Sequence, residues 1–147
     1  MSRIRLKPEP VYEFSYHVTL KPRDMNYGGH LGNDTLVTLA GEARAGLFKD
    51  LGFSEGDLGD GQTALIMGDL AVNYRAEGFL YDELLIESHL GEITRNSMRI
   101  FHRVTKKGTL VALAETGVLA FDYRKRRIGE IPHVFMESLK KYNEAQV

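Results

Sequence analysis

Apolar and polar residues alternate in the first patterned stretch of the chain, residues 11–20. Four aromatic or aliphatic side chains fall on one face of an extended backbone: Tyr12, Phe14, Tyr16 and Val18. Aromatic and β-branched residues favour strands, so this stretch is expected to form one. Residues 21–32 contain proline, asparagine and three glycines, a composition that predicts a loop.

A helix is predicted over Asp34–Leu51, where apolar residues recur at a spacing close to 3.6. The stripe consists of Leu36, Leu39, Ala40, Ala43, Leu47 and Leu51. Asn33 is a suitable N-cap, and Gly52 fits the position after the last turn. The segment also contains several alanines and two glycines, and an interior glycine costs a helix about 1 kcal/mol. We therefore expect another element to pack very closely against this helix, such as a strongly curved sheet.

The chain from Gln62 to Tyr123 shows the two-residue period of strands almost throughout. The parity of its apolar positions changes at Gly68-Asp69, which predicts a β-bulge. The segment Lys106–Thr109 has the composition of a hairpin turn. Residues 110–122 are apolar on both faces, which predicts either a central strand or a surface buried between two copies of the chain.

The predicted order is a strand, a long helix, four long antiparallel strands and a short C-terminal helix. The simplest arrangement of these elements is an α+β fold, in which a curved antiparallel sheet of five or six strands wraps the long helix. The chain has 147 residues, of which 43% are hydrophobic. This size fits one domain covering residues 1–147 with a substantial core.

Composition excludes several classes of function. The chain has no cysteine, which excludes a disulfide framework, a zinc–thiolate site and a cysteine nucleophile. Its histidines show no metal-ligand spacing, so no metal is expected. A net charge of −1 disfavours nucleic acid as a partner. We find neither a signal peptide nor an apolar run long enough to cross a membrane, and we expect a cytoplasmic protein with no membrane partner.

Charge is distributed unevenly along the sequence. Residues 91–147 contain eleven Lys or Arg against six Asp or Glu, whereas residues 1–90 contain eight against fourteen. A basic C-terminal third in a nearly neutral protein suits an anionic small molecule better than a nucleic-acid duplex.

Polar and small residues are concentrated in the loop that leads into the predicted helix. Asn26, His30 and Asn33 lie in this loop, and Glu42 follows inside the helix. The N-terminus of a helix presents unpaired N–H groups and about half a positive charge. Such donors can act as an oxyanion hole, and a nearby histidine can transfer protons near neutral pH. The pattern favours polarisation and attack of an acyl carbonyl.

Each of these residues also has an ordinary structural interpretation. Asn26 can bond to the backbone of its own turn, and His30 can be held by a neighbouring carboxylate. Capping the helix could be the whole role of Asn33, and Glu42 can form an ion pair with a basic residue such as Arg44. The sequence leaves both interpretations open for all four candidates.

The loop and the helix resemble the hotdog-fold thioesterases, in the branch that includes 4-hydroxybenzoyl-CoA thioesterase. The pattern of that family is Asp-x-Asp-x-x-Gly-His-x-x-Asn, followed by a helix containing Glu-Ala-Arg. Here these segments are Asp24-Met25-Asn26-Tyr27-Gly28-Gly29-His30-Leu31-Gly32-Asn33 and Glu42-Ala43-Arg44. The similarity covers about Tyr12–Tyr123 and includes Val72-Asn73-Tyr74 and Gly108–Ala112.

This resemblance implies a hotdog fold and hydrolysis of an acyl-CoA thioester. Amides near Asn33 would polarise the carbonyl. Asn26 stands where many members carry a catalytic Asp, and an amide can orient a carbonyl or a water but cannot take a proton from it. His30 or Glu42 is therefore expected to be the base. The resemblance further implies a homodimer that shares a continuous sheet, or a tetramer.

No separate cofactor is expected, because coenzyme A enters as part of the substrate. The basic run Arg124, Lys125, Arg126 and Arg127 is a candidate for contact with its phosphates, since Arg offers bidentate geometry. A solvated turn is the alternative interpretation of this run. Two other functions stay open: an acyl-CoA or acyl-carrier binding protein without catalysis, and a hydroxyacyl-thioester dehydratase that pairs His30 with Glu42.

Overall fold

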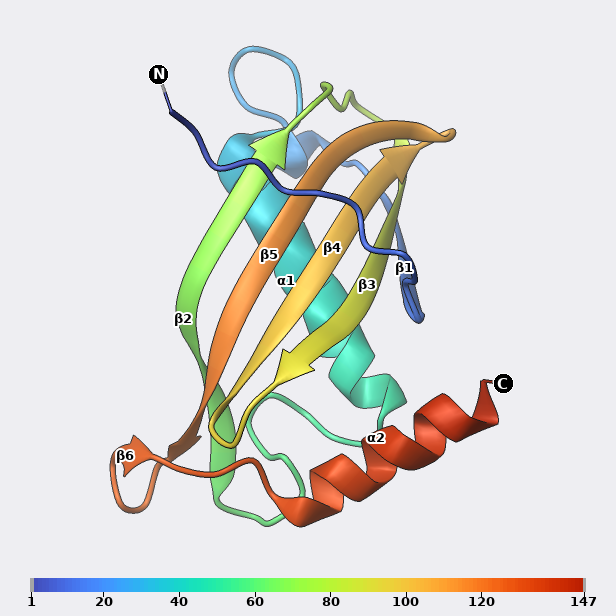
Figure 1. The fold of residues 1–147 in the computed structure, drawn as a ribbon. Coiled ribbons are helices and arrows are strands. Elements are labelled where there is room, and N and C mark those ends of the chain that lie inside the picture. The colour runs from blue at the N-terminus through green and yellow to red at the C-terminus, as the bar shows by residue number, and fades with distance from the viewer. Residues whose placement is uncertain (1, 147) are drawn as a thin grey trace.

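Residues 2–146 are described by a computed structural model, and they form six strands and two α-helices (Figure 1). In chain order, the elements are β1 (Phe14–Thr19), a 3-10 turn (Pro22–Asp24), α1 (Asn33–Asp50), β2 (Thr63–Tyr74), β3 (Glu83–Ile93), β4 (Ser97–Lys106), β5 (Thr109–Asp122), β6 (Arg127–Ile128) and α2 (His133–Ala145). This confirms the predicted order, to which the structure adds the two-residue strand β6.

The strands form one antiparallel sheet in the order β1-β3-β4-β5-β2, with β6 pairing to the end of β5. The sheet curves around α1, and the segment that precedes β1 crosses its opposite face (Figure 1). β5 lies between β4 and β2, so the prediction of a central strand is confirmed. β2 forms one edge of the sheet.

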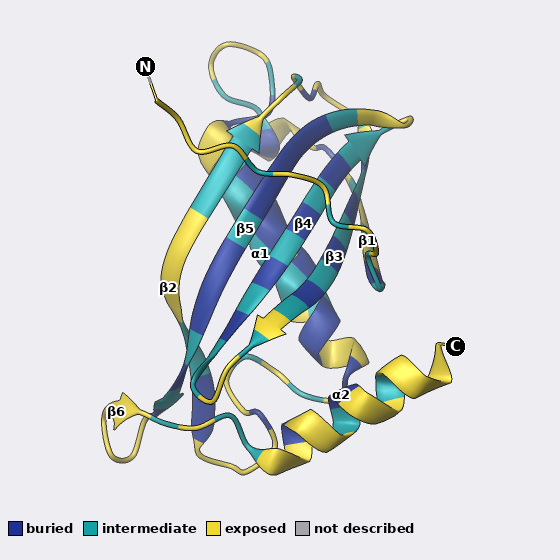
Figure 2. Ribbon diagram, in the orientation of Figure 1, coloured by how far each residue is buried: buried dark blue, intermediate teal, exposed yellow. Residues whose placement is uncertain are grey.

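The predicted apolar stripe of α1 faces the sheet and is buried (Figure 2). Leu36, Leu39 and Ala43 pack into a cluster with Ile86 and Val104 of the sheet. The expectation that close packing explains all the small residues is wrong in part. Ala45 is exposed and Gly41 is only half-buried, so both lie away from the buried stripe.

Local turn chemistry follows the sequence closely. The pairing of β2 with β5 shifts between Met67 and Asp69, which confirms the bulge. Lys107 and Gly108 have φ values of 46° and 80°, as the two central residues of a tight hairpin of type I′ require. Gly52 ends α1 in the left-handed region, with φ at 89°.

α2 closes the end of the core that lies opposite the N-terminus of α1 (Figure 1). Phe135 and Leu139 are buried in a cluster with Leu47 and Phe48 of α1. The ring of Tyr142 stacks on that of Phe14, with 5.0 Å between the ring centroids. α2 does not cover the other end of the core, where α1 begins and where the loop that precedes it lies (Figure 1). Neither helix in the described residues is long and apolar enough to span a membrane.

Candidate functional site

α1 begins at Asn33, and Gly32 is its N-cap. The prediction that Asn33 caps the helix is therefore wrong by one residue. The N–H of Gly32 donates to the carbonyl oxygen of Asp24 at 3.2 Å, and its own carbonyl accepts the N–H of Leu36 at 3.0 Å. No side chain caps this helix. Within residues 2–146, the N–H groups of the next three positions, 33–35, find no acceptor.

A cleft of about 210 Å³ opens at this end of α1, and of these three positions it is Asn33 that lines it. Its walls are the loop before α1, the first turn of α1, the end of β2 and the turn that follows β2. Asn26, His30 and Asn33 all line it, so three of the four predicted catalytic residues meet here. Tyr74 and Glu77 also line the cleft, and neither was predicted to be a catalytic or binding residue.

The Asn26 side chain shapes the loop and also borders the cleft. Its Oδ1 accepts the N–H of Gly28 at 2.9 Å and that of His30 at 3.4 Å. Its backbone N–H donates to the carbonyl oxygen of His30 at 2.9 Å. Oδ1 of Asn26 therefore holds the backbone of its own turn, as the structural interpretation of this residue predicted. Among the described residues Nδ2 has no acceptor, so it is available to donate to a carbonyl oxygen in the cleft.

His30 lies close to a carboxylate from a different part of the chain. Its Nε2 is 3.8 Å from Oε1 of Glu77, and its Nδ1 is 3.4 Å from the carbonyl oxygen of Leu31. This contact places a carboxylate beside Nε2 of the imidazole. Glu77 is 47 residues from His30 in the sequence, and it reaches the cleft because it lies in the turn that follows β2.

Tyr74 joins β2 to the first turn of α1. Its hydroxyl donates to the carbonyl oxygen of Asn33 at 2.8 Å. Burial, reinforced by the negative charge of Asp34, raises the pKa of the Tyr74 hydroxyl. The hydrogen bond of this hydroxyl links two walls of the cleft, the end of β2 and the first turn of α1.

Glu42 lies outside this cleft. It follows Asn33 by nine residues, or about 13 Å along the helix axis. Its carboxylate accepts a hydrogen bond from the Tyr16 hydroxyl at 3.0 Å, which raises the pKa of that hydroxyl. Glu42 lines a separate depression between β1 and α1. Arg44, its proposed ion-pair partner, instead binds the carboxylate of Glu55.

The basic run 124–127, between β5 and β6, lies at the opposite end of the sheet from the N-terminus of α1 (Figure 1). The cleft lies at that N-terminus. β5 pairs with Tyr74 through Ala112 and with Arg127 through Asp122. These two positions are ten residues apart on β5, which corresponds to about 30 Å of strand. The run and the cleft of the same chain are therefore separated by most of the length of the molecule.

The contacts of the run itself are those of a tight turn. The backbone N–H groups of Arg124 and Lys125 donate to Oδ1 of Asp122 at 2.9 and 3.0 Å. Arg126 has φ at 55°, and its guanidinium lies 5.7 Å from the ring centroid of Phe121. Within residues 2–146, no group of three or more His, Asp or Glu side chains is arranged to hold a metal ion.

Comparison with known proteins identifies the family. A model of the Thioesterase-like superfamily matches residues 20–139, which is most of the chain. The chain belongs to this superfamily. The matched segment contains the whole cleft, from the loop before α1 to the turn after β2. No curated protein matches the sequence significantly.

Solved structures show that the fold is the hotdog fold that the resemblance implied. A 1,4-dihydroxy-2-naphthoyl-CoA thioesterase from Synechocystis has a TM-score of 0.77 and 16% identity, over 85% of this chain and 93% of that one. A DHNA-CoA thioesterase from Staphylococcus aureus has a TM-score of 0.78 and 17% identity, over 90% of each chain. A hypothetical protein from Staphylococcus aureus, in complex with CoA, has a TM-score of 0.82 and 16% identity, over 94% of this chain and 89% of that one.

Proposed function

We propose that this protein hydrolyses acyl-CoA thioesters in the cleft at the start of α1. The observation that carries this proposal is the uncapped N-terminus of α1, where Asn33, whose N–H has no acceptor within residues 2–146, lines a cleft together with His30 and Asn26. Membership of the superfamily supports thioester hydrolysis. The names of the similar structures, two CoA thioesterases and a CoA complex, support CoA as the carrier of the acyl group.

The proposed reaction uses the free amides as an oxyanion hole. The carbonyl oxygen of the thioester accepts hydrogen bonds from N–H groups in the first turn of α1, and the Nδ2 of Asn26 orients it. His30 takes a proton from a water molecule, whose oxygen attacks the carbonyl carbon. The negative charge that develops on the carbonyl oxygen is stabilised by the positive end of the helix.

The second half of the reaction returns the proton. The tetrahedral intermediate collapses and its carbon–sulfur bond breaks, which releases the thiolate of CoA and the free acid. The thiolate takes the proton that His30 carries, so the enzyme is regenerated. Glu77 stabilises the imidazolium of His30 between the two transfers.

The geometry supports His30 rather than Glu42 as the base. Glu42 lies about two and a half turns down the helix, in a different depression, and is bound to Tyr16. The dehydratase alternative needs His30 and Glu42 to act on one substrate, and within this chain they line separate pockets.

We also propose that two copies pair along β2, as the resemblance implies. β2 is an edge of the sheet, and an edge strand with exposed apolar side chains is prone to pair with another chain. Met67, Leu70 and Tyr74 on this strand are 48%, 40% and 53% exposed. Pairing through β2 would cover all three and bring the second copy close to the cleft, which Tyr74 also lines.

Hydrolysis of a panel of aliphatic and aromatic acyl-CoA substrates tests the proposal. The released thiol is measured with a thiol reagent, and the protein has no thiol of its own to react. His30→Gln should lower kcat by at least about 100-fold, since general base catalysis contributes that much. His133→Gln, which changes an exposed histidine on α2, is the matched control and should leave kcat unchanged.

Two outcomes would contradict this assignment. Full activity in His30→Gln would show that another group is the base. No turnover of any acyl-CoA, combined with tight binding of the same compounds in a calorimeter, would instead establish the alternative of a binding protein without catalysis.

A further inference from the structure

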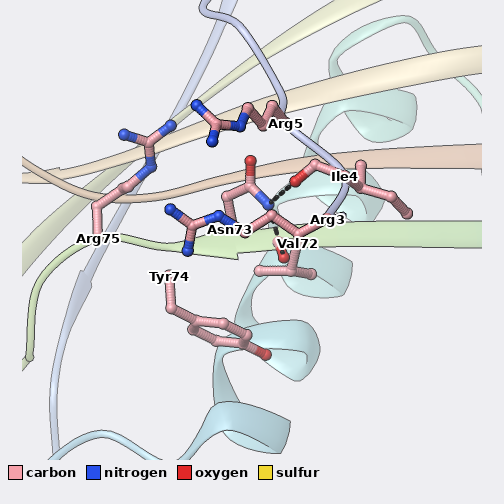
Figure 3. A pocket seen from close by; sticks show the side chains of 7 residues that line it. All are labelled: Arg3, Ile4, Arg5, Val72, Asn73, Tyr74 and Arg75. Atoms are coloured by element: carbon pink, nitrogen blue, oxygen red, sulfur yellow. Dashed lines mark hydrogen bonds between the residues drawn. The ribbon is translucent and has the colours of Figure 1, made fainter. Parts of the chain in front are cut away.

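Three arginine side chains from two distant segments of the chain meet beside the end of β2. Arg3 and Arg5 come from the segment before β1, and Arg75 directly follows β2. The three side chains line one pocket of about 530 Å³. Figure 3 shows their guanidinium groups gathered on one side of it. The other residues that line this pocket are uncharged.

None of these three guanidiniums has an acidic partner within residues 2–146. Arginines on the sheet behave differently: Arg99 is bound by two carboxylates, and Arg103 by one. Three like charges held together without a counter-charge repel one another, and a bound anion removes that cost. Guanidinium groups also match the geometry of phosphate oxygens better than any other side chain does.

Asn73 holds the N-terminal segment in this position. Its Oδ1 accepts the N–H of Leu6 at 2.7 Å, and its Nδ2 donates to the carbonyl oxygen of Ile4 at 2.9 Å. Asn73 lies in β2 and Arg75 directly follows the strand, and Figure 3 shows both side chains on one side of the backbone, opposite to the ring of Tyr74. The two hydrogen bonds therefore place Arg3 and Arg5 beside Arg75 (Figure 3).

The arginine pocket adjoins the proposed catalytic cleft. Tyr74, which lies between Asn73 and Arg75 on the strand, lines both the arginine pocket and the cleft. A ligand with phosphates at one end and a thioester at the other can therefore pass Tyr74 and occupy both. Coenzyme A has this form, since it carries a pyrophosphate and a 3′-phosphate at the end remote from sulfur.

We infer that Arg3, Arg5 and Arg75 bind the phosphate groups of coenzyme A and select a CoA thioester over the same acyl group on a carrier without those charges. This inference rests on the proposed function and names its carrier. It assigns the phosphates to arginines beside the cleft, in place of the run 124–127 about 30 Å along the sheet.

The test compares one acyl group on two carriers, CoA and pantetheine, which lacks all three phosphates. Wild-type protein should hydrolyse the CoA thioester with kcat/KM at least about 30-fold higher, mostly through a lower KM, because each charge-assisted contact favours binding. The R3Q/R5Q/R75Q variant should reduce this preference to about threefold or less and leave kcat for the pantetheine thioester unchanged.

A control variant, K49Q/K140Q/K141Q, removes three exposed positive charges away from both pockets. Its preference should match that of wild type, which excludes an effect of net charge alone. A third variant, R124Q/K125Q/R127Q, removes three charges from the basic run. If that variant loses the preference while R3Q/R5Q/R75Q keeps it, the phosphates bind to the run of a second copy and the inference is overturned.

Calorimetry with adenosine 3′,5′-bisphosphate, which contains no thioester, separates this inference from the proposed function. Binding that R3Q/R5Q/R75Q weakens by about tenfold or more supports the phosphate site even if no thioester is hydrolysed. Hydrolysis without any preference between the two carriers would overturn the phosphate site and leave the proposed function standing.

Discussion

His102 is a buried histidine that makes the stability of the protein depend on pH. It lies in the middle of β4, with its side chain 1% exposed. Its Nδ1 is 2.7 Å from the hydroxyl of Ser88, and its Nε2 has no partner among the described residues. Burial, and secondarily the positive charge of Arg44, lowers the pKa of His102 from 6.5 to about 4.

The magnitude follows from the difference between the folded and unfolded pKa of His102. Below pH 6.5, His102 binds a proton in the unfolded chain but stays neutral in the folded protein until the pH approaches 4. Acid therefore favours unfolding. The free energy of unfolding should fall by about 1.4 kcal/mol per pH unit across this range. Between pH 6.5 and the folded pKa of about 4, the total loss is on the order of 3 kcal/mol, and no further loss from this group follows below it.

Urea unfolding at a series of pH values from 7 to 4 measures this effect. The comparison is with a S88A/H102L variant, which removes the imidazole and also the hydroxyl that would be left without its partner. Carboxylates elsewhere titrate in both proteins, so the difference between the two slopes isolates His102. His133→Gln, on the surface of α2, should keep the wild-type slope. Equal slopes in wild type and S88A/H102L would refute the reasoning.

Three other predictions concern the site and the sheet edge. Gly78→Ala should destabilise the protein by about 1–3 kcal/mol in urea unfolding, because the added Cβ would lie 2.9 Å from Leu20 Cδ1. The control is Gly56→Ala, whose added Cβ would lie 3.7 Å from the hydroxyl of Ser54, and its stability should equal that of wild type. Asn73→Ala should raise KM for the CoA thioester about threefold to tenfold through release of Arg3 and Arg5, without changing kcat or the KM of the pantetheine thioester. Leu70→Lys should convert the proposed dimer to a monomer in sedimentation velocity, whereas Met136→Lys, which is similarly exposed on α2, should leave the oligomeric state of the wild type unchanged. A wild type that sediments as a monomer would contradict pairing along β2.

The elements of the fold were largely predictable because each depends on a local pattern. The apolar stripe of α1, the parity change at Gly68-Asp69 and the hairpin at Lys107-Gly108 are all encoded within a few neighbouring residues. The N-cap was misplaced by one residue for a reason that is not local. The backbone of Gly32 bonds to Asp24 across the loop, and the helix therefore begins at Asn33 itself.

The site was predictable only where it is contiguous in sequence. Asn26, His30 and Asn33, which all belong to one short motif, line one wall of the cleft. Glu77 and the arginine pocket depend on contacts between residues about 45 to 70 positions apart, which no spacing rule reveals. The direction of β5 likewise decides that the run 124–127 lies far from the cleft, and that direction follows from the pairing of whole strands.

Gly68, the bulge residue of β2, decides which face of the sheet Tyr74 and Arg75 point from, and therefore which pocket each of them reaches. Leu65 and Val72 both pack on the core although one number is odd and the other even, because Gly68 is counted in the chain but has no partner on β5. If Gly68 were instead paired with β5 in a regular ladder, all later residues of the strand would exchange faces. The phenol of Tyr74 and the guanidinium of Arg75 would then trade sides, and the route from the arginine pocket to the cleft would be lost through the pairing of one residue six positions before Tyr74.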